Sequence, residues 1–355
     1  MKMSRFLKEK FSKMESYTPG EQPQDKKYIK LNTNESPFPP SKGVLEAIND
    51  QSVSQLNLYP DPDCSVLRSS IAKYYGVNKS NVFVSNGSDD ILSFAFMAFC
   101  SESSPAAFPD ISYGFYKVYA ELHGAKYTEI PLKEDFSIDV KDYIGINKNI
   151  FIANPNAPTG LTLSLEEISQ ICESNKNNIV LIDEAYVDFG GESSVGLTEK
   201  YDNLITVMTY SKSRSMAGAR LGFAIANEAI IDDLNKIKYS TNPYSINRLT
   251  NLAGIAAIED AEYYENNCKI VIENREYTKN ELRKMGFDCT DSKSNFLFAK
   301  NPKISGAELY AKLKDKGVLV RHFGKERIKD YIRVTVGTKE EMNAFLNAVK
   351  EILSI

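Results

Sequence analysis

The residues of this chain with the clearest chemical potential are an acid and a lysine near its middle. Asp183 follows the apolar run 179–182, and Lys212 follows the apolar run 204–208 within a Ser-Lys pair. In open α/β sheets, ligands bind at the carboxyl ends of buried strands, where such side chains would lie. A lysine amine can form a Schiff base, and a carboxylate can keep a neighbouring cation charged. Taken singly, the acid also suits a helix cap, and a Ser-Lys pair is most often on the surface.

Other polar residues accompany this pair. The turn 154–160 reads Asn-Pro-Asn-Ala-Pro-Thr-Gly and precedes the acid, and Tyr186 stands three positions after the acid. Ser211 directly precedes the lysine, and Arg220 follows the lysine by eight positions. A turn rich in Pro, Asn and Gly is common by itself. It is the succession of turn, strand-end acid, lysine and arginine that indicates a ligand site.

A segment upstream has the features of a phosphate-binding turn. Residues 85–90 read Ser-Asn-Gly-Ser-Asp-Asp and join a predicted strand to a predicted helix. Gly87 permits a tight turn, and the backbone N–H groups at a helix start can hold a phosphate dianion. Asp89 also suits a plain helix cap, and it can cap the helix while its own N–H binds the anion.

Apolar runs alternate with helical patterns between about residues 82 and 226. The predicted strands are 82–85, 106–108, 150–153, 179–182, 204–208 and 221–226, and the predicted helices are 89–99, 114–122 and 165–173. Ser164 precedes Glu167 by three positions, which is the spacing of a capping box. This alternation predicts a mostly parallel α/β sheet.

The pattern changes after about Lys238. A long helical stretch is predicted from about 244 to 285, followed by strands and a closing helix. These strands are predicted at 295–299, 318–322 and 331–335, and the helix at 339–353. The order suits a smaller α+β domain, and the prolines of the first forty residues indicate an extended arm. We expect an arm over 1–43 that packs on the small domain, a large domain over 44–240 and a small domain over 241–355.

Composition excludes several classes of protein. The 355 residues are 42% hydrophobic and 25% charged, which is typical of a globular protein. The net charge of -4 argues against general nucleic-acid binding. Five widely spaced cysteines and two histidines argue for reduced, mostly buried thiols and against a disulfide framework or a metal centre. With no apolar run long enough for a signal peptide or a membrane span, we expect a cytoplasmic protein.

In their order, these motifs resemble the fold-type-I, class I and II aminotransferases, which depend on pyridoxal 5'-phosphate (PLP). The resemblance implies a large PLP-binding domain whose mostly parallel, seven-stranded sheet is sandwiched by helices. It implies that Lys212 carries PLP as a Schiff base and that Asp183 faces the pyridine nitrogen, which keeps the ring protonated as an electron sink. Tyr186 would reach the phenolic oxygen of the ring.

The resemblance also implies contacts to the phosphate and to the ring face. Ser211 and Arg220 would bind the phosphate, with Arg220 offering a planar fork of donors. Ser88 and Asp89 would add contacts from the segment 85–90. Tyr113 would stack on the pyridine ring, although an aromatic side chain of the core is the alternative for this residue.

Further segments resemble the histidinol-phosphate aminotransferases within this group. They are Tyr17-Thr18-Pro19-Gly20, Leu31 to Pro37, Tyr59-Pro60-Asp61, Leu319 to Phe323 and Tyr331 to Gly337. The resemblance implies histidine biosynthesis, and a homodimer in which Tyr59 reaches the phosphate of the PLP in the partner subunit. Tyr17, Arg321 and Arg333 would bind both the phosphate of histidinol phosphate and the carboxylate of glutamate. Solvated arginines on edge strands are the alternative.

One position departs from the family pattern. The usual turn reads Asn-Asn-Pro-Thr-Gly, and its second Asn hydrogen-bonds the phenolic oxygen of PLP. This chain has Ala157 there, which has no such group. Asn156 would have to take over this contact, or Tyr186 would act alone.

Other activities remain compatible with these motifs. A decarboxylase of threonine phosphate shares the fold and the arginine pair, but it releases carbon dioxide and needs no oxo acid. An aromatic or other amino-acid aminotransferase is a second alternative. Non-enzymatic PLP-fold modules usually carry a DNA-binding domain, for which we expect no space in the short arm before Tyr17.

Overall fold

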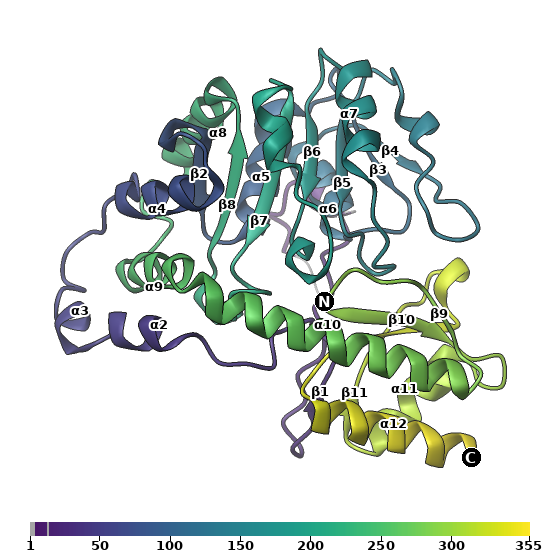
Figure 1. The fold of residues 1–355 in the computed structure, drawn as a ribbon. Coiled ribbons are helices and arrows are strands. Elements are labelled where there is room, and N and C mark those ends of the chain that lie inside the picture. Colours follow the sequence, from purple (N-terminus) through teal and green to yellow (C-terminus); the bar gives the residue numbers. More distant parts are fainter. Residues whose placement is uncertain (1–3, 13) are drawn as a thin grey trace.

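The computed structural model describes residues 4–12 and 14–355, which form sheets with helices around them (Figure 1). The strands of the largest sheet are β2 (Val82–Ser85), β3 (Ala106–Pro109), β4 (Tyr127–Ile130), β5 (Asn149–Ala153), β6 (Val180–Asp183), β7 (Leu204–Thr209) and β8 (Gly222–Ala226). Their order is β2-β8-β7-β6-β5-β3-β4. β8 is antiparallel to both of its neighbours, and the other pairings are parallel. The predicted mostly parallel, seven-stranded sheet is confirmed.

Both faces of this sheet are buried, which explains the sequences of its strands. Along β5, Phe151 packs on one face, while Ile150 and Ile152 pack on the other. The first face is covered by α5 (Ser88–Phe99), α6 (Phe115–His123) and α8 (Glu228–Thr241). The second face is covered by α4 (Ser65–Tyr75), α7 (Leu165–Ser174) and α9 (Arg248–Glu259). Because neither face meets water, the strands read as continuous apolar runs.

The strand directions bring the polar segments of the sequence together. β2, β5, β6 and β7 run the same way, so their carboxyl ends meet at one edge of the sheet. The last residues of these strands are Ser85, Ala153, Asp183 and Thr209. The chain re-enters the sheet at this edge through β8, directly after Arg220 and Leu221. The segments that follow these strands, with the acid and the lysine, therefore emerge at the same edge.

A second, antiparallel sheet is built from the C-terminal part of the chain. Its strands are β9 (Asp288–Cys289), β10 (Phe296–Lys300), β12 (Arg321–His322) and β13 (Tyr331–Thr335), in the order β12-β13-β10-β9. The helices of this region are α10 (Ala261–Lys284), α11 (Gly306–Asp315) and α12 (Lys339–Leu353). Beside them, β1 (Ile29–Lys30) pairs in parallel with β11 (Val318–Leu319). The N-terminal segment thus contributes a strand to the C-terminal part.

Two predicted elements are corrected by the structure. The helix predicted over 244–285 is divided into α9 and α10 at Asp260, whose carboxylate accepts hydrogen bonds from the Ser41 hydroxyl at 2.5 Å and the Gly43 N–H at 3.2 Å. The strand predicted over 318–322 is divided because β11 pairs with β1, whereas β12 pairs with β13. Both breaks arise from partners that are distant in sequence.

Other elements agree with the sequence or were not predicted. Ser164 and Glu167 form the predicted capping box of α7. The edge strand β4 and several helices were not predicted, since their residues are partly exposed and lack a clear apolar run. The remaining helices at the N-terminal end are α1 (Glu9–Ser12), α2 (Lys42–Ala47) and α3 (Asp50–Ser54).

The described part of the chain lacks two further features. Within residues 4–12 and 14–355, no helix is long and apolar enough to cross a membrane. The same residues contain no group of three His, Cys, Asp or Glu side chains placed to hold a metal ion. All five cysteines are buried and unpaired, as predicted from their spacing.

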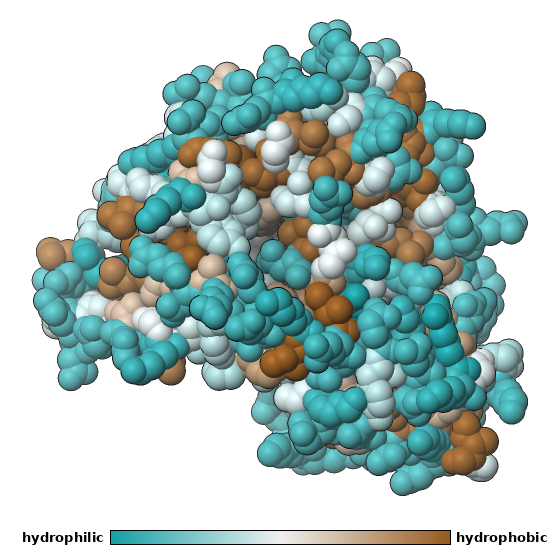
Figure 2. All heavy atoms as spheres, in the orientation of Figure 1, coloured by the Kyte–Doolittle hydropathy of each residue, from teal (hydrophilic) through white to brown (hydrophobic). Residues whose placement is uncertain are grey.

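Apolar side chains are exposed around α2 and α3. The exposed large side chains of this region are Leu45, Ile48, Val53, Leu56, Leu58 and Tyr59. Figure 2 shows apolar atoms on the surface at the end of the molecule formed by these two helices. Apolar exposure concentrated in one region is typical of a protein–protein interface.

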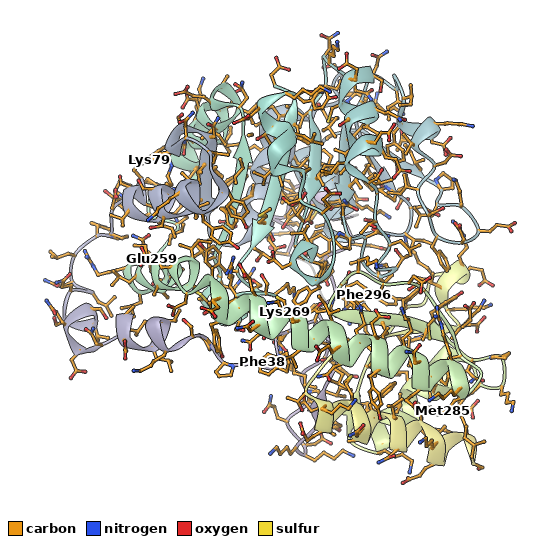
Figure 3. The ribbon with its side chains drawn as sticks, viewed as in Figure 1. Phe38, Lys79, Glu259, Lys269, Met285 and Phe296 are labelled. Carbon is orange, nitrogen blue, oxygen red and sulfur yellow. The ribbon has the colours of Figure 1, made fainter. Side chains whose placement is uncertain are left out.

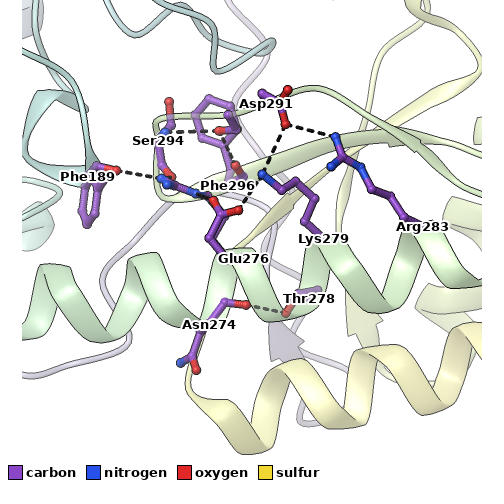
Figure 4. A network of polar contacts seen from close by, with 11 residues as sticks. Phe189, Asn274, Glu276, Thr278, Lys279, Arg283, Asp291, Ser294 and Phe296 are labelled. Atoms are coloured by element: carbon purple, nitrogen blue, oxygen red, sulfur yellow. Dashed lines mark hydrogen bonds and ion pairs between the residues drawn. The ribbon is translucent and has the colours of Figure 1, made fainter.

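The long helix α10 links the two sheets. It continues from the end of α9, near Glu259, past Lys269 to Met285 beside the smaller sheet, and Phe296 of β10 lies above it (Figure 3). Figure 4 shows the polar contacts along this helix. Arg275 is buried, and its Nη1 donates hydrogen bonds to the Phe189 carbonyl at 2.7 Å and to the Ser294 carbonyl at 2.8 Å. One guanidinium therefore joins the loop after β6 to the turn before β10.

We expect Arg275→Met to lower the free energy of unfolding by about 2–5 kcal/mol, because two buried carbonyls would lose their donor. The matched control is Arg283→Met on the same helix. The Arg283 side chain is 45% exposed and pairs with Asp291 at 3.0 Å, so its loss should change stability by less than about 1 kcal/mol. Urea unfolding of both variants measures the difference, and equal effects would contradict the role of Arg275.

Candidate active site

A cavity of about 520 Å³ lies at the edge where the strands end. It is lined by residues of the larger sheet, of the smaller sheet and of the N-terminal segment. The predicted site residues among its lining are Tyr17, Ser88, Asp89, Tyr113, Asp183, Tyr186, Ser211, Lys212, Arg220, Arg321 and Arg333. The fold thus gathers into one cavity side chains that are more than 300 positions apart in sequence.

Lys212 enters the cavity from the loop after β7. Its Nζ donates a hydrogen bond to the Thr33 carbonyl at 3.3 Å and lies 5.8 Å from the ring centroid of Tyr186. The next residue, Ser213, is buried and donates its hydroxyl hydrogen to Asp188. The loop is therefore fixed beside the lysine, while the amine has only a carbonyl as hydrogen-bond partner among the described residues.

Asp183 lies at the floor of the cavity and is 5% exposed. Its carboxylate accepts hydrogen bonds from the Tyr116 hydroxyl at 3.1 Å and the Ala185 N–H at 3.2 Å. Burial raises the pKa of Asp183 to about 6, although these two donors oppose the shift. Two neutral donors offset only part of the cost of burying this negative charge, so the carboxylate is suited to bind a cationic group of a ligand.

The neighbouring acid, Glu184, faces away from the cavity. Successive side chains of a strand point to opposite faces, so only one of the two acids can line the site. Glu184 accepts hydrogen bonds from the hydroxyls of Ser193 and Ser194 and from the Ser194 N–H at 2.6–2.7 Å. Burial raises the pKa of Glu184 to about 7. It holds the following loop against the sheet.

One end of the cavity has the shape and charge of an anion cradle. Arg220 reaches over Gly87, so that a Cβ added at Gly87 would lie 2.9 Å from its Nη2. Nη1 of the same guanidinium donates to the Ser211 hydroxyl at 3.3 Å. Within residues 4–12 and 14–355, no side chain caps the first N–H groups of α5, which begins at Ser88. These amides, the hydroxyls of Ser88 and Ser211 and the Arg220 guanidinium can together hold a phosphate.

Asp89 organises this end of the cavity. Its carboxylate pairs with Arg220 Nη2 at 2.8 Å and accepts the Tyr113 hydroxyl at 2.6 Å. Tyr113 is thereby held at the wall, and Tyr17 stacks on the adjacent Phe115 with ring centroids 4.2 Å apart. An acid beside a phosphate cradle is thus explained as a side chain that orients the arginine and the aromatic ring.

Two arginines from the smaller sheet also line the cavity. Arg321 and Arg333 are paired in register on the strands β12 and β13. Arg321 donates to the carbonyls of Pro19 and Thr18 at 3.2 and 3.0 Å, and Arg333 donates to the Asn32 carbonyl at 3.1 Å. Within the described residues, the buried Nε of Arg333 has no hydrogen-bond partner. Such an orphan donor suits an anionic group of a ligand.

Two predicted residues lie outside this cavity. The Asn156 amide donates to the Ile111 carbonyl and the Thr159 hydroxyl, both at 3.0 Å, and its oxygen accepts the Ser112 hydroxyl. These contacts use the side chain within the turn, and Ala157 lines the cavity in its place. Tyr59 is 78% exposed and stacks on Tyr244, so it reaches no part of the site in its own chain.

Sequence reasoning missed two residues that contact the site residues. Tyr116 supports Asp183 from the first turn of α6, and Asn34 donates a hydrogen bond to the Tyr186 hydroxyl at 3.0 Å. Tyr113 precedes α6, so helical spacing gave no signal that Tyr116 would join it at the site. No local signal pairs Asn34 with Tyr186, since 152 positions separate them.

Comparisons with known proteins agree with this geometry. The family described as aminotransferase class I and II matches residues 26–349. The chain belongs to this family. A histidinol-phosphate aminotransferase of Brachyspira hyodysenteriae is 53% identical to this aminotransferase over 352 residues, which is 99% of each chain.

Solved structures share the fold of this aminotransferase. The histidinol-phosphate aminotransferase of Clostridium acetobutylicum superposes with a TM-score of 0.84 and 26% identity, over 92% of this chain and 99% of that one. The enzyme of Sinorhizobium meliloti, solved in complex with PLP, gives a TM-score of 0.84 at 22% identity, over 92% and 90% of the two chains. The predicted fold class and family are therefore confirmed.

The cofactor of this aminotransferase is PLP, as in its family. The cavity fits the parts of that molecule. Asp183 is a buried acid suited to a protonated pyridine nitrogen, and the cradle around Gly87 and Arg220 suits a phosphate. Lys212 lines the same cavity, and its amine is suited to react with an aldehyde.

In the cofactor-free protein, rising pH should destabilise the fold through Asp183. Its pKa is raised from 3.8 to about 6, so the folded state binds this proton more tightly than the unfolded chain does. The free energy of unfolding should therefore fall by about 2 kcal/mol from pH 4 to pH 7 through this group. Asp183→Asn should remove this part of the profile, as urea unfolding at several pH values would reveal. Glu184 is present in both proteins, so its contribution cancels in the comparison. Identical stability profiles of the parent protein and Asp183→Asn would refute the raised pKa of Asp183.

Proposed function

We propose that this aminotransferase moves an amino group between histidinol phosphate, or a similar phosphorylated amine, and the 2-oxoglutarate/glutamate pair by a ping-pong mechanism. The observation that carries this proposal is the position of Arg321 and Arg333, which are paired in register and line the same cavity as Lys212. The proposal also draws on the activity for which the relative with 53% identity is named. That activity would place the protein in histidine biosynthesis.

Lys212 is proposed to carry the cofactor and to move a proton. When bound, PLP supplies a ring that withdraws electrons from the reacting carbon. Asp183 would keep that ring protonated, and Tyr116 would hold Asp183 in place. Tyr186, close to Lys212, would donate its hydroxyl hydrogen to the phenolic oxygen of the cofactor. Once the substrate amine has displaced it, Lys212 can serve as the base at the substrate carbon.

Other residues are proposed to hold the ends of the cofactor. Ser88, Ser211 and Arg220 would bind its phosphate together with the amides at the start of α5. Asp89 would act through its own N–H and by orienting Arg220 and Tyr113. Tyr113, in the cavity wall, would stack on the pyridine ring.

The substrate anions are assigned to Arg321 and Arg333. In the part of the chain that the structure describes, the buried Nε of Arg333 lacks a partner, and Arg321 donates hydrogen bonds only to backbone carbonyls. A phosphate or a carboxylate would be a stronger acceptor than these neutral carbonyls. The hydroxyl of Tyr17, which lines the same cavity, would complete the site.

We expect histidinol to react at least about tenfold less efficiently in kcat/KM than histidinol phosphate, because a charge-assisted contact would be lost. Arg321→Ala should erase most of this preference. Arg333→Ala should slow both half-reactions, since it would also bind the carboxylate of glutamate. Product analysis with each amine and 2-oxoglutarate measures these effects, and Lys212→Arg is the inactive control.

The same assay separates the competing activities. Equal rates with histidinol and its phosphate, or an Arg321→Ala variant that behaves like the parent, would refute the phosphate pocket. Release of carbon dioxide from threonine phosphate without an oxo acid would identify a decarboxylase. Transamination of aromatic amino acids in preference to histidinol phosphate would identify the other alternative.

We also propose that the enzyme is a homodimer with shared active sites. Tyr59 is exposed next to the apolar surface around α2 and α3, and Arg248 donates to its carbonyl at 3.1 Å. A two-fold dimer would cover these apolar side chains and bring Tyr59 to the phosphate cradle of the partner. We further propose the division of the chain into an arm over 1–43, a large domain over 44–240 and a small domain over 241–355.

Mixing two inactive variants tests the shared site. If Tyr59 acts in the partner, Tyr59→Ala mixed with Lys212→Arg should recover activity, because each hybrid dimer contains one site with both residues intact. Random exchange would restore about a quarter of the activity of the parent protein. A Tyr59 that serves its own subunit would give no recovery, and sedimentation of an active monomer would refute the dimer itself.

A further inference from the structure

The hydroxyl of Tyr186 has a partner that comes from the N-terminal segment. Asn34 is 1% exposed, and its Nδ2 donates a hydrogen bond to the Tyr186 Oη at 3.0 Å. A phenol that accepts such a bond still has its own hydrogen to donate. Since both residues line the cavity, that hydrogen is available to a molecule bound there.

The orientation of the Asn34 amide is set by Thr335. The Asn34 N–H donates to the Thr335 Oγ1 at 2.9 Å, and the Thr335 hydroxyl donates to the Asn34 Oδ1 at 3.1 Å. Because the amide oxygen receives this hydrogen, the amide nitrogen must face Tyr186. A flipped amide would turn its NH2 group toward the Thr335 hydroxyl, which now donates to the amide oxygen. It would also turn the amide oxygen toward Tyr186, where that oxygen would accept the hydroxyl hydrogen.

The backbone around Asn34 is equally constrained. Asn34 has a left-handed φ of 56°, a conformation that asparagine tolerates better than most residues. Its carbonyl accepts a hydrogen bond from the Asn295 side chain at 3.0 Å. β13, which ends at Thr335, therefore holds Asn34 in place together with the turn before β10.

This arrangement matters because the turn 154–160 presents no side-chain amide of Asn156 to the cavity. Ala157 lines the cavity with a methyl group, and the Asn156 amide is engaged within the turn. Tyr186 is therefore left as the hydroxyl assigned to the phenolic oxygen of PLP.

We propose that Asn34 is a positioning residue, which accepts no hydrogen from Tyr186 and so directs the Tyr186 hydrogen toward the phenolic oxygen of the cofactor. This inference rests on the roles proposed above for Tyr186 and Lys212. A hydrogen bond to a phenolate favours its charged form and weakens its attraction for the proton of the neighbouring Schiff base. The donation from Asn34 polarises the Tyr186 hydroxyl and strengthens that bond.

The test is the pH titration of the visible absorption of the PLP-loaded protein, which reports the pKa of the Schiff base at Lys212. Asn34→Gly keeps the left-handed backbone and removes the amide, so this pKa should rise by about half a unit to one unit. Tyr186→Phe should raise it at least as much. In the Tyr186→Phe background, Asn34→Gly should add nothing, because Asn34 acts only through the hydroxyl.

A second pair of variants leaves Asn34 in place. Thr335→Val keeps the shape of the side chain but lets the amide flip, so it should raise the same pKa. Thr335→Ser retains the hydroxyl and should titrate like the parent protein. The charged groups that line this cavity are unchanged in every variant; they are Asp89, Asp183, Lys212, Arg220, Arg321, Lys325 and Arg333. Thermal unfolding of each protein separates the effect from a general loss of stability.

The outcomes are distinct from failure of the proposed function. If the parent protein shows no titrating Schiff base, or borohydride fixes PLP on another lysine, the assignment of Lys212 fails. If the parent titrates but Asn34→Gly and Thr335→Val do not shift the pKa, the inference about Asn34 is overturned. The same holds if Asn34→Gly shifts the pKa equally when Tyr186 has no hydroxyl.

Discussion

The rest of the structure depends on the burial of one carboxylate. Asp183 lies at the end of a central strand with little water and two neutral donors, so its charge is poorly compensated until a cation arrives. Tyr116 must come from α6 to support it, and strand alternation sends Glu184 to the other face. A cofactor with a protonated ring resolves this cost, which ties cofactor binding to the electrostatics of the core.

The second constraint is the assembly of one cavity from distant parts of the chain. The larger sheet supplies the acid, the lysine and the phosphate cradle, whereas the smaller sheet supplies Arg321 and Arg333. Arg275 joins these parts by bonding one carbonyl from each. The carbonyls of the N-terminal segment accept hydrogen bonds from Arg321, Arg333 and Lys212, so this segment contacts residues from both sheets.

Much of the larger sheet was predictable because its cause is local. A strand buried on both faces must be apolar throughout, so β2, β5 and β7 appear as short apolar runs. The edge strand β4 has no such run and escaped prediction. The break at Asp260 also escaped, because it depends on hydrogen bonds from residues more than 200 positions away.

The sequence by itself determined the family, the cofactor and the residues at the ends of the strands, because these are written in contiguous motifs. Only the tertiary structure decided which polar groups meet. It engaged the Asn156 amide within its own turn, turned Glu184 away from the cavity and placed Asn34 against Tyr186. The physical reason is that a hydrogen bond is short and directional, so its partner depends on the path of the whole backbone and not on the neighbouring residues.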